Sequence, residues 1–119
     1  MTTFPFSLLF KCAERFDTRQ HANALYNFME LLMRSLEHHA NSPTDILCQT
    51  FAGSEYGYLL QAPVPFETLC QYIDPLLRKH QIITHVKVQG TKFKERDFYT
   101  DVVTFYLSEY LSNKKDKTA

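Results

Sequence analysis

The order of apolar segments predicts an α+β domain of the ferredoxin-like, split βαβ class, with an antiparallel sheet and an additional C-terminal helix. Two long stretches repeat apolar residues every three or four positions, as amphipathic helices do. Four short apolar runs have the length and composition of strands. In chain order, β-α-β-β-α-β, the segments are 4–10, 18–40, 46–52, 56–62, 65–80 and 82–88.

The first strand and the first helix follow from local patterns. Phe6, Leu8 and Phe10 alternate with other residues, so they are expected on one face of a strand. Asp17 can accept hydrogen bonds from free amides at the start of the following helix. The segment 41–43, Asn-Ser-Pro, is expected to end that helix because proline cannot continue it.

The middle of the chain predicts a hairpin followed by a second helix and a strand. Gly53 lies between segments 46–52 and 56–62, where a tight turn needs unusual backbone angles. Gly57, inside the second strand of the hairpin, predicts a bulge or a place where another backbone or a ligand comes close. Pro75 predicts a kink in helix 65–80, or a restart of the helix with Asp74 as its cap.

The segment 98–111 fits two structures. Its apolar residues gather on one side of a helical wheel. The negative charge of Asp97, just before the segment, would interact favourably with the dipole of a helix that starts there, so these features predict a C-terminal helix. Its β-branched and aromatic residues favour a strand, which would pair with segment 82–88 through a basic loop. We expect residues 1–112 to form a single domain and residues 113–119 a flexible polar tail.

The composition is typical of a soluble globular protein, with 45% hydrophobic and 22% charged residues. No run of 18 apolar residues is present, and the N-terminus lacks the features of a secretory signal. Cys12, Cys48 and Cys70 are odd in number, widely spaced and each in an apolar segment, which favours buried free thiols. These observations predict a cytoplasmic protein.

Charge is separated along the chain although the formal net charge is +0. Residues 1–77 carry four basic residues against eight acidic ones, whereas residues 78–96 carry six basic residues against Glu95 alone. A basic segment of this kind can attract an acidic partner, or it can be an ordinary solvated surface.

No motif in the sequence indicates catalysis, and we predict neither a cofactor nor a metal site. The spacings typical of zinc sites, nucleophilic serines and phosphate-binding loops do not occur. Cys70 lies near the start of a helix, which favours a thiolate slightly, but it also belongs to the apolar stripe. An enzyme that uses Cys70 or a histidine is therefore the third hypothesis, and no catalytic residue is assigned.

Binding to a macromolecule is the remaining class. Aromatic residues make up 14% of the chain and suit an interface with another protein. We predict a non-enzymatic protein-binding module of inhibitor, immunity or adaptor type, with self-association through a sheet edge or the aromatic C-terminal segment as a companion possibility. The predicted partner-binding residues are Tyr56, Tyr58, Lys87, Lys92, Phe93, Lys94 and Arg96. The alternative is that the same residues bind single-stranded RNA or DNA, by stacking bases on the two tyrosines of an open sheet.

Overall fold

The computed structural model describes residues 2–52 and 55–100. Within them, five strands and two helices follow one another: β1 (Phe4–Cys12), α1 (Thr18–Ala40), β2 (Asp45–Ala52), β3 (Glu55–Ala62), α2 (Phe66–Lys79), β4 (Ile83–Gln89) and β5 (Glu95–Tyr99). The first six elements confirm the predicted α+β order, and each boundary lies within two residues of its predicted position.

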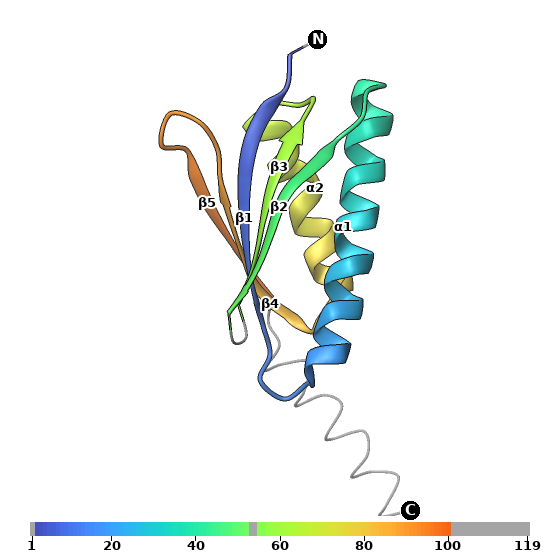
Figure 1. Cartoon of the computed structure of the whole chain (residues 1–119), viewed down its shortest axis with the longest axis vertical. Helices are drawn as coiled ribbons and strands as arrows, with labels where there is room; N and C mark the ends of the chain where they lie inside the picture. The colour runs from blue at the N-terminus through green and yellow to red at the C-terminus, as the bar shows by residue number, and fades with distance from the viewer. Residues whose placement is uncertain (1, 53–54, 101–119) are drawn as a thin grey trace, which may run out of the picture.

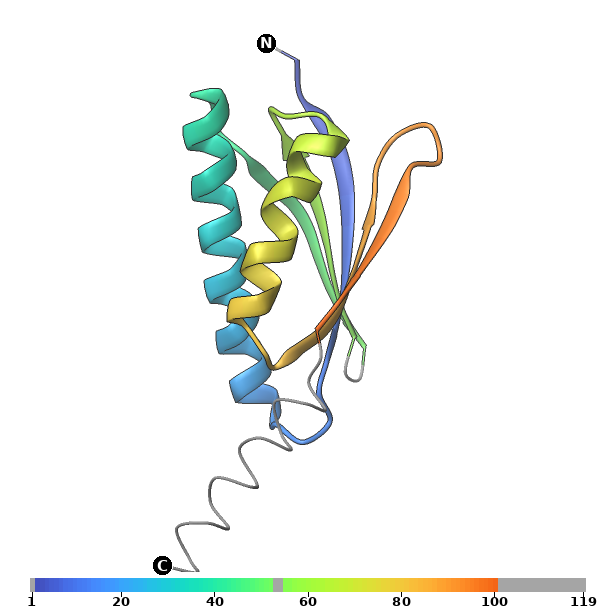
Figure 2. The ribbon, with the colours of Figure 1, turned by 180° about the vertical axis from the view of Figure 1, so that it is seen from behind.

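The strands form one antiparallel sheet in the order β2-β3-β1-β4-β5. Both helices pack on the same face of this sheet, so the opposite face is open (Figure 1). Figure 2, seen from behind, shows α2 between α1 and the β4–β5 side of the sheet. β1 occupies the centre, and the two edges of the sheet are β2 and β5.

The fifth strand corrects the prediction of about four strands and a C-terminal helix starting at Phe98. Phe98 and Tyr99 belong to β5, which pairs with β4 through a basic loop, as in the strand alternative. This strand begins at Glu95, before the start of segment 98–111, to which the prediction applied. The rest of the predicted helix, residues 101–111, lies outside the described residues.

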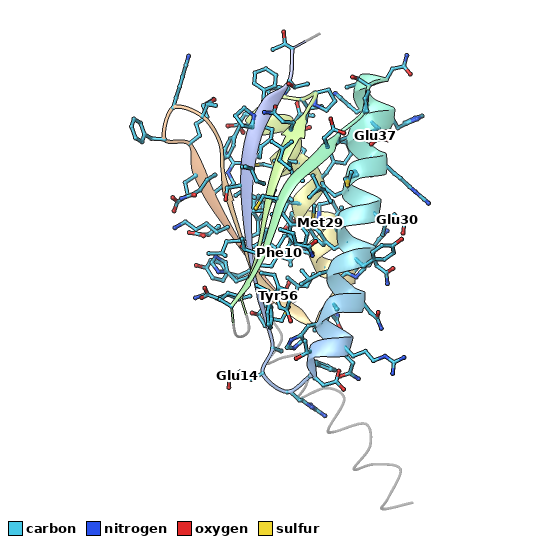
Figure 3. The ribbon with its side chains drawn as sticks, viewed as in Figure 1. Phe10, Glu14, Met29, Glu30, Glu37 and Tyr56 are labelled. Atoms are coloured by element: carbon cyan, nitrogen blue, oxygen red, sulfur yellow. The ribbon has the colours of Figure 1, made fainter. Side chains whose placement is uncertain are left out.

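The core lies between the sheet and the helices because alternate strand residues point to the covered face. Phe10 of β1 meets Phe28 of α1 and Tyr58 of β3 edge to face, with ring centroids 5.2 and 5.6 Å apart. Met29 lies beside them, on the side of α1 that faces the sheet (Figure 3). These contacts join the central strand to the long helix.

The helix ends match their sequence signals at α1 and depart from them at α2. The Asp17 side chain accepts from the Gln20 amide at 2.8 Å, and Gln20 reciprocates, which forms a capping box. Helix α2 continues through Pro75 without the alternative restart. Asp74 instead accepts from Arg78 one turn later, at 3.2 Å.

Candidate functional site: the hairpin between β4 and β5

The loop between β4 and β5 holds its tip in a conformation that ordinary residues resist. Lys92 and Phe93 have φ angles of 59° and 60°, in the left-handed region. For a residue with a side chain this region costs roughly 1–2 kcal/mol. Among the described residues, the other non-glycine residue with positive φ is Asn41, which ends α1. Two such residues in succession are what a tight hairpin turn requires, and the Lys94 amide donates to the Thr91 carbonyl across this turn at 3.4 Å.

Phe93 projects from this tip into solvent. Its relative exposure is 104%, the highest of the large hydrophobic residues in the described part of the chain. Burying a phenylalanine side chain is worth about 1.5–3 kcal/mol. A partner surface that covers this exposed ring would therefore gain a favourable contribution to its free energy of binding.

The base of the hairpin is fixed against the start of α2. A Cβ atom on Gly90 would lie 2.8 Å from the Phe66 ring, so only glycine allows this contact without a shift. The Phe66 ring also packs on Phe6 of β1, with centroids 6.5 Å apart. The loop closes with a hydrogen bond of 2.8 Å from the Gly90 amide to the Lys94 carbonyl. The anchored base sets the direction in which the tip points.

Basic residues near the hairpin divide into paired and available groups. Arg96 forms an ion pair with Glu67 at 3.1 Å and lies over the Phe66 ring, 5.7 Å from its centroid. Lys94 lies over the same ring at 5.9 Å. Lys87 pairs with Glu95 at 3.1 Å, and the hydrogen bond that its ammonium group donates to this carboxylate raises the pKa of Lys87.

Lys92 and Lys94 differ from Lys87 and Arg96 because neither forms an ion pair with any other described residue. Lys92 lies beside Phe93 at the tip, and both side chains are exposed. The available part of the predicted binding surface is therefore the tip formed by Lys92, Phe93 and Lys94, which we call the hairpin tip.

The structure does not bring Tyr56 and Tyr58 to this surface. Each is 7% exposed and lies on the helix-covered face of β3, together with Leu60. Their hydroxyl groups have partners inside the protein. Tyr56 donates to Nδ1 of His21 at 3.5 Å, because Nε2 of this ring donates to the Ala13 carbonyl, and Gln49 donates to Tyr58 at 3.0 Å. The two rings belong to the hydrophobic core, because alternate residues of β3 point to the helix-covered face.

The open face of the sheet lacks the stacking platform that the nucleic-acid hypothesis needs. Leu9, Gly57 and Leu59 lie near its centre, where the two tyrosines had been expected. Among the described strands, the aromatic residue of this face is Tyr99, which stacks on His85 with centroids 4.5 Å apart. Sequence-tolerant binding of bases requires exposed rings in succession. No observation on this face favours RNA.

Of the three thiols, Cys12 and Cys70 are buried as predicted, whereas Cys48 is exposed, which corrects the prediction that all three are buried. Burial raises the pKa of Cys12 to about 11 and also raises the pKa of Cys70, so both thiols stay protonated. Burial lowers the pKa of His80, which lines a cavity of 530 Å³ between α1 and α2. The described lining of that cavity contains no hydroxyl, thiol or carboxylate that this imidazole could activate.

Residues 2–52 and 55–100 also bear on metal binding and on membrane crossing. There, no three histidine, cysteine, aspartate or glutamate side chains gather closely enough to hold a metal ion. Neither described helix combines the length and apolarity that crossing a membrane would require.

Comparisons with known proteins support the fold. No protein-family model and no curated protein matches the chain. Its fold is similar to a solved structure from Thermotoga maritima, the P2 domain of the chemotaxis kinase CheA in complex with the response regulator CheY. The TM-score is 0.55 at 12% sequence identity, over 76% of this chain and 100% of the other. At this identity the similarity shows a shared fold.

Two residues of the site are not evident from the sequence. Gly90 and Phe66 fix the base of the hairpin, yet they are 24 positions apart and belong to different elements. A glycine directly before a basic loop is the one available signal, and it indicates a turn rather than a contact with an aromatic ring.

Proposed function

We propose that this domain is a non-enzymatic protein-binding module that docks through the hairpin tip. The observation that carries the proposal is the exposure of Phe93 on a loop whose backbone is held at positive φ. Strain of this kind persists only where the surrounding structure imposes it, and it is concentrated at functional positions. The module presents a ready-made anchor and therefore loses little entropy when it binds.

The chemistry of the tip defines the partner. Phe93 requires an apolar pocket, and the flanking Lys92 and Lys94 require acidic residues at the rim of that pocket. Rim charges mainly increase the rate of association, whereas a buried aromatic anchor supplies affinity. The partner is therefore a protein with an acidic surface around a hydrophobic depression.

A fold-level analogy supports the class of function. The similar P2 domain of CheA was solved in complex with another protein, the response regulator CheY. A small α+β domain of this architecture is thus suited to protein docking, although one fold hosts many functions. The analogy supports docking in general and leaves the partner to be identified by the chemistry of the tip.

The experiment is a quantitative pull-down from native cell extract with the full chain as bait, at low and moderate salt. Proteins are identified by mass spectrometry, and the absorbance ratio of the eluate reports nucleic acid. The wild-type chain should retain a protein in stoichiometric amount at moderate salt. Phe93→Ser should remove it, and Lys92→Glu with Lys94→Glu should reduce its recovery most strongly at low salt.

The matched control is Leu31→Ser, which removes an exposed apolar side chain from α1, on an element other than the hairpin. This variant should retain the partner fully. Equal recovery by wild type and Phe93→Ser contradicts the proposal. Elution of nucleic acid as the salt concentration rises, without a protein partner, supports nucleic-acid binding instead.

A further inference from the structure

The two edges of the sheet are built differently. All eight residues of β2 are exposed, and Asp45 at its start is the only charged one. β5 carries three charges in five residues, at Glu95, Arg96 and Asp97. Natural proteins protect sheet edges with charged side chains and proline, because a bare edge offers unpaired backbone groups to another strand. β5 has this protection. β2 has it only at its start, where Asp45 and a bulge at Leu47 lie, and residues 48–52 lack it.

The β2 edge is also apolar on the side that faces the helices. Phe51 and Ile46 are exposed there. Phe51 packs on Tyr56, and Ile46 lines a cavity together with Tyr26 of α1. This cavity lies between α1 and β2 and has a volume of 530 Å³. Its lining is largely apolar and aromatic: Ala22, Asn23, Leu25, Tyr26, Met29, Ile46, Gln49, Tyr56 and Tyr58. A strand added to β2 would place alternate side chains at the mouth of this cavity.

We infer that the occupant is a second copy of this chain, paired antiparallel through β2 about a two-fold axis. The charges favour a copy. In an antiparallel pair, the two Asp45 carboxylates lie at opposite ends of the interface, so no like charges meet across it. A two-fold arrangement uses the same surface on both chains, which is the commonest way for soluble proteins to form dimers.

The strand itself limits the register of this pair. A bulge at Leu47 interrupts the ladder with β3, and residues 48–52 form the regular part of the edge. Pairing centred on Thr50 places Gln49 of one chain opposite Phe51 of the other. Both residues lie on the helix-covered face, because their partners on β3 are Tyr58 and Tyr56. The apolar faces of the two copies therefore join in one continuous layer.

The dimer surface is independent of the hairpin tip, which lies beyond the other edge of the sheet (Figure 1). The test is sedimentation equilibrium of the full chain over a range of concentrations, with reductant present to prevent a disulfide through Cys48. Wild type should reach twice the mass of the 14.0 kDa chain. Thr50→Lys, which brings two ammonium groups together, should weaken the dimer about tenfold or more.

Thr91→Lys is the matched control, since it makes the same chemical change at the exposed hairpin near the opposite edge. It should leave the dimer intact. Hydrogen exchange on the wild-type chain gives a second measurement that does not depend on a variant folding. Exchange in residues 45–52 should slow as the concentration rises, while residues 95–99 stay unchanged. A monomer at all concentrations, or a dimer broken by Thr91→Lys but not by Thr50→Lys, overturns the inference.

Discussion

The side-chain oxygen of Thr50 on β2 lies over Gly57 on β3, 2.5 Å from the position that a Cβ atom of residue 57 would occupy. The two residues are opposite each other in the ladder. The sequence predicted either a bulge at Gly57 or a close approach by another backbone or a ligand. The structure shows instead a close approach by the Thr50 side chain, and the bulge of this hairpin lies at Leu47.

Gly57→Ala should therefore destabilise the fold through Thr50. The new methyl group needs the threonine to rotate or the strands to separate, and overpacking of this kind costs about 1–3 kcal/mol. In a Thr50→Ala background the same change should be neutral or stabilising, because alanine loses less entropy than glycine in a strand. Urea unfolding of the four chains measures the coupling. Equal effects of Gly57→Ala in both backgrounds would show that Thr50 is not the obstacle.

Lys92→Gly should raise stability, since glycine adopts positive φ without a steric penalty. The relief of roughly 1–2 kcal/mol is partly offset by the greater freedom of glycine in the unfolded chain, so we expect a net gain of about 0.5–1 kcal/mol. Thermal unfolding provides the measurement. Thr91→Gly is the control: residue 91 does not have positive φ, so this change should lower stability. A loss of stability in Lys92→Gly would argue against strain at the tip.

Alkaline conditions should destabilise the protein through Cys12. Burial raises its pKa from 9.0 to about 11, so the folded chain holds the thiol proton more tightly than the unfolded chain does. The resulting stability is complete below pH 9 and is lost as the pH rises toward 11, by up to about 1.4 kcal/mol per pH unit. Burial raises the pKa of Cys70, Tyr56 and Tyr58 too, so their contributions have the same sign.

Cys12→Ala isolates this contribution. The variant should be less stable than wild type near neutral pH because it leaves a small cavity, but its stability should fall less steeply between pH 8 and pH 10. Urea midpoints at several pH values give both slopes. Parallel curves for the two chains would mean that Cys12 does not titrate differently on folding.

The regular part of the fold follows from local patterns because each element buries a periodic apolar face. The α1 helix is the clearest case, with its cap at Asp17 and its left-handed end at Asn41. β5 could not be predicted in the same way. Its sequence, Glu-Arg-Asp-Phe-Tyr, has three charges and no apolar alternation, and it forms a strand because it pairs with β4.

The candidate site was predictable only in part. The basic and aromatic residues of the loop stand together in the sequence, so Lys92, Phe93 and Lys94 could be proposed. The orientation of Tyr56 and Tyr58 depends on which face of β3 the helices cover, and a strand with apolar residues on both faces does not decide this. Leu59 made the two faces look alike, although it is exposed on the open face.

The unequal edges of the sheet have a consequence for the size of any assembly. A sheet with two edges that can both pair is able to add a chain at each edge, so an assembly of such sheets grows without limit. Among the described strands, the charges of β5 oppose pairing at one edge and leave β2 as the edge that can pair. Under the proposed pairing, two chains that meet through β2 cover that edge in both copies, so the described sheet offers no second uncharged edge for further growth.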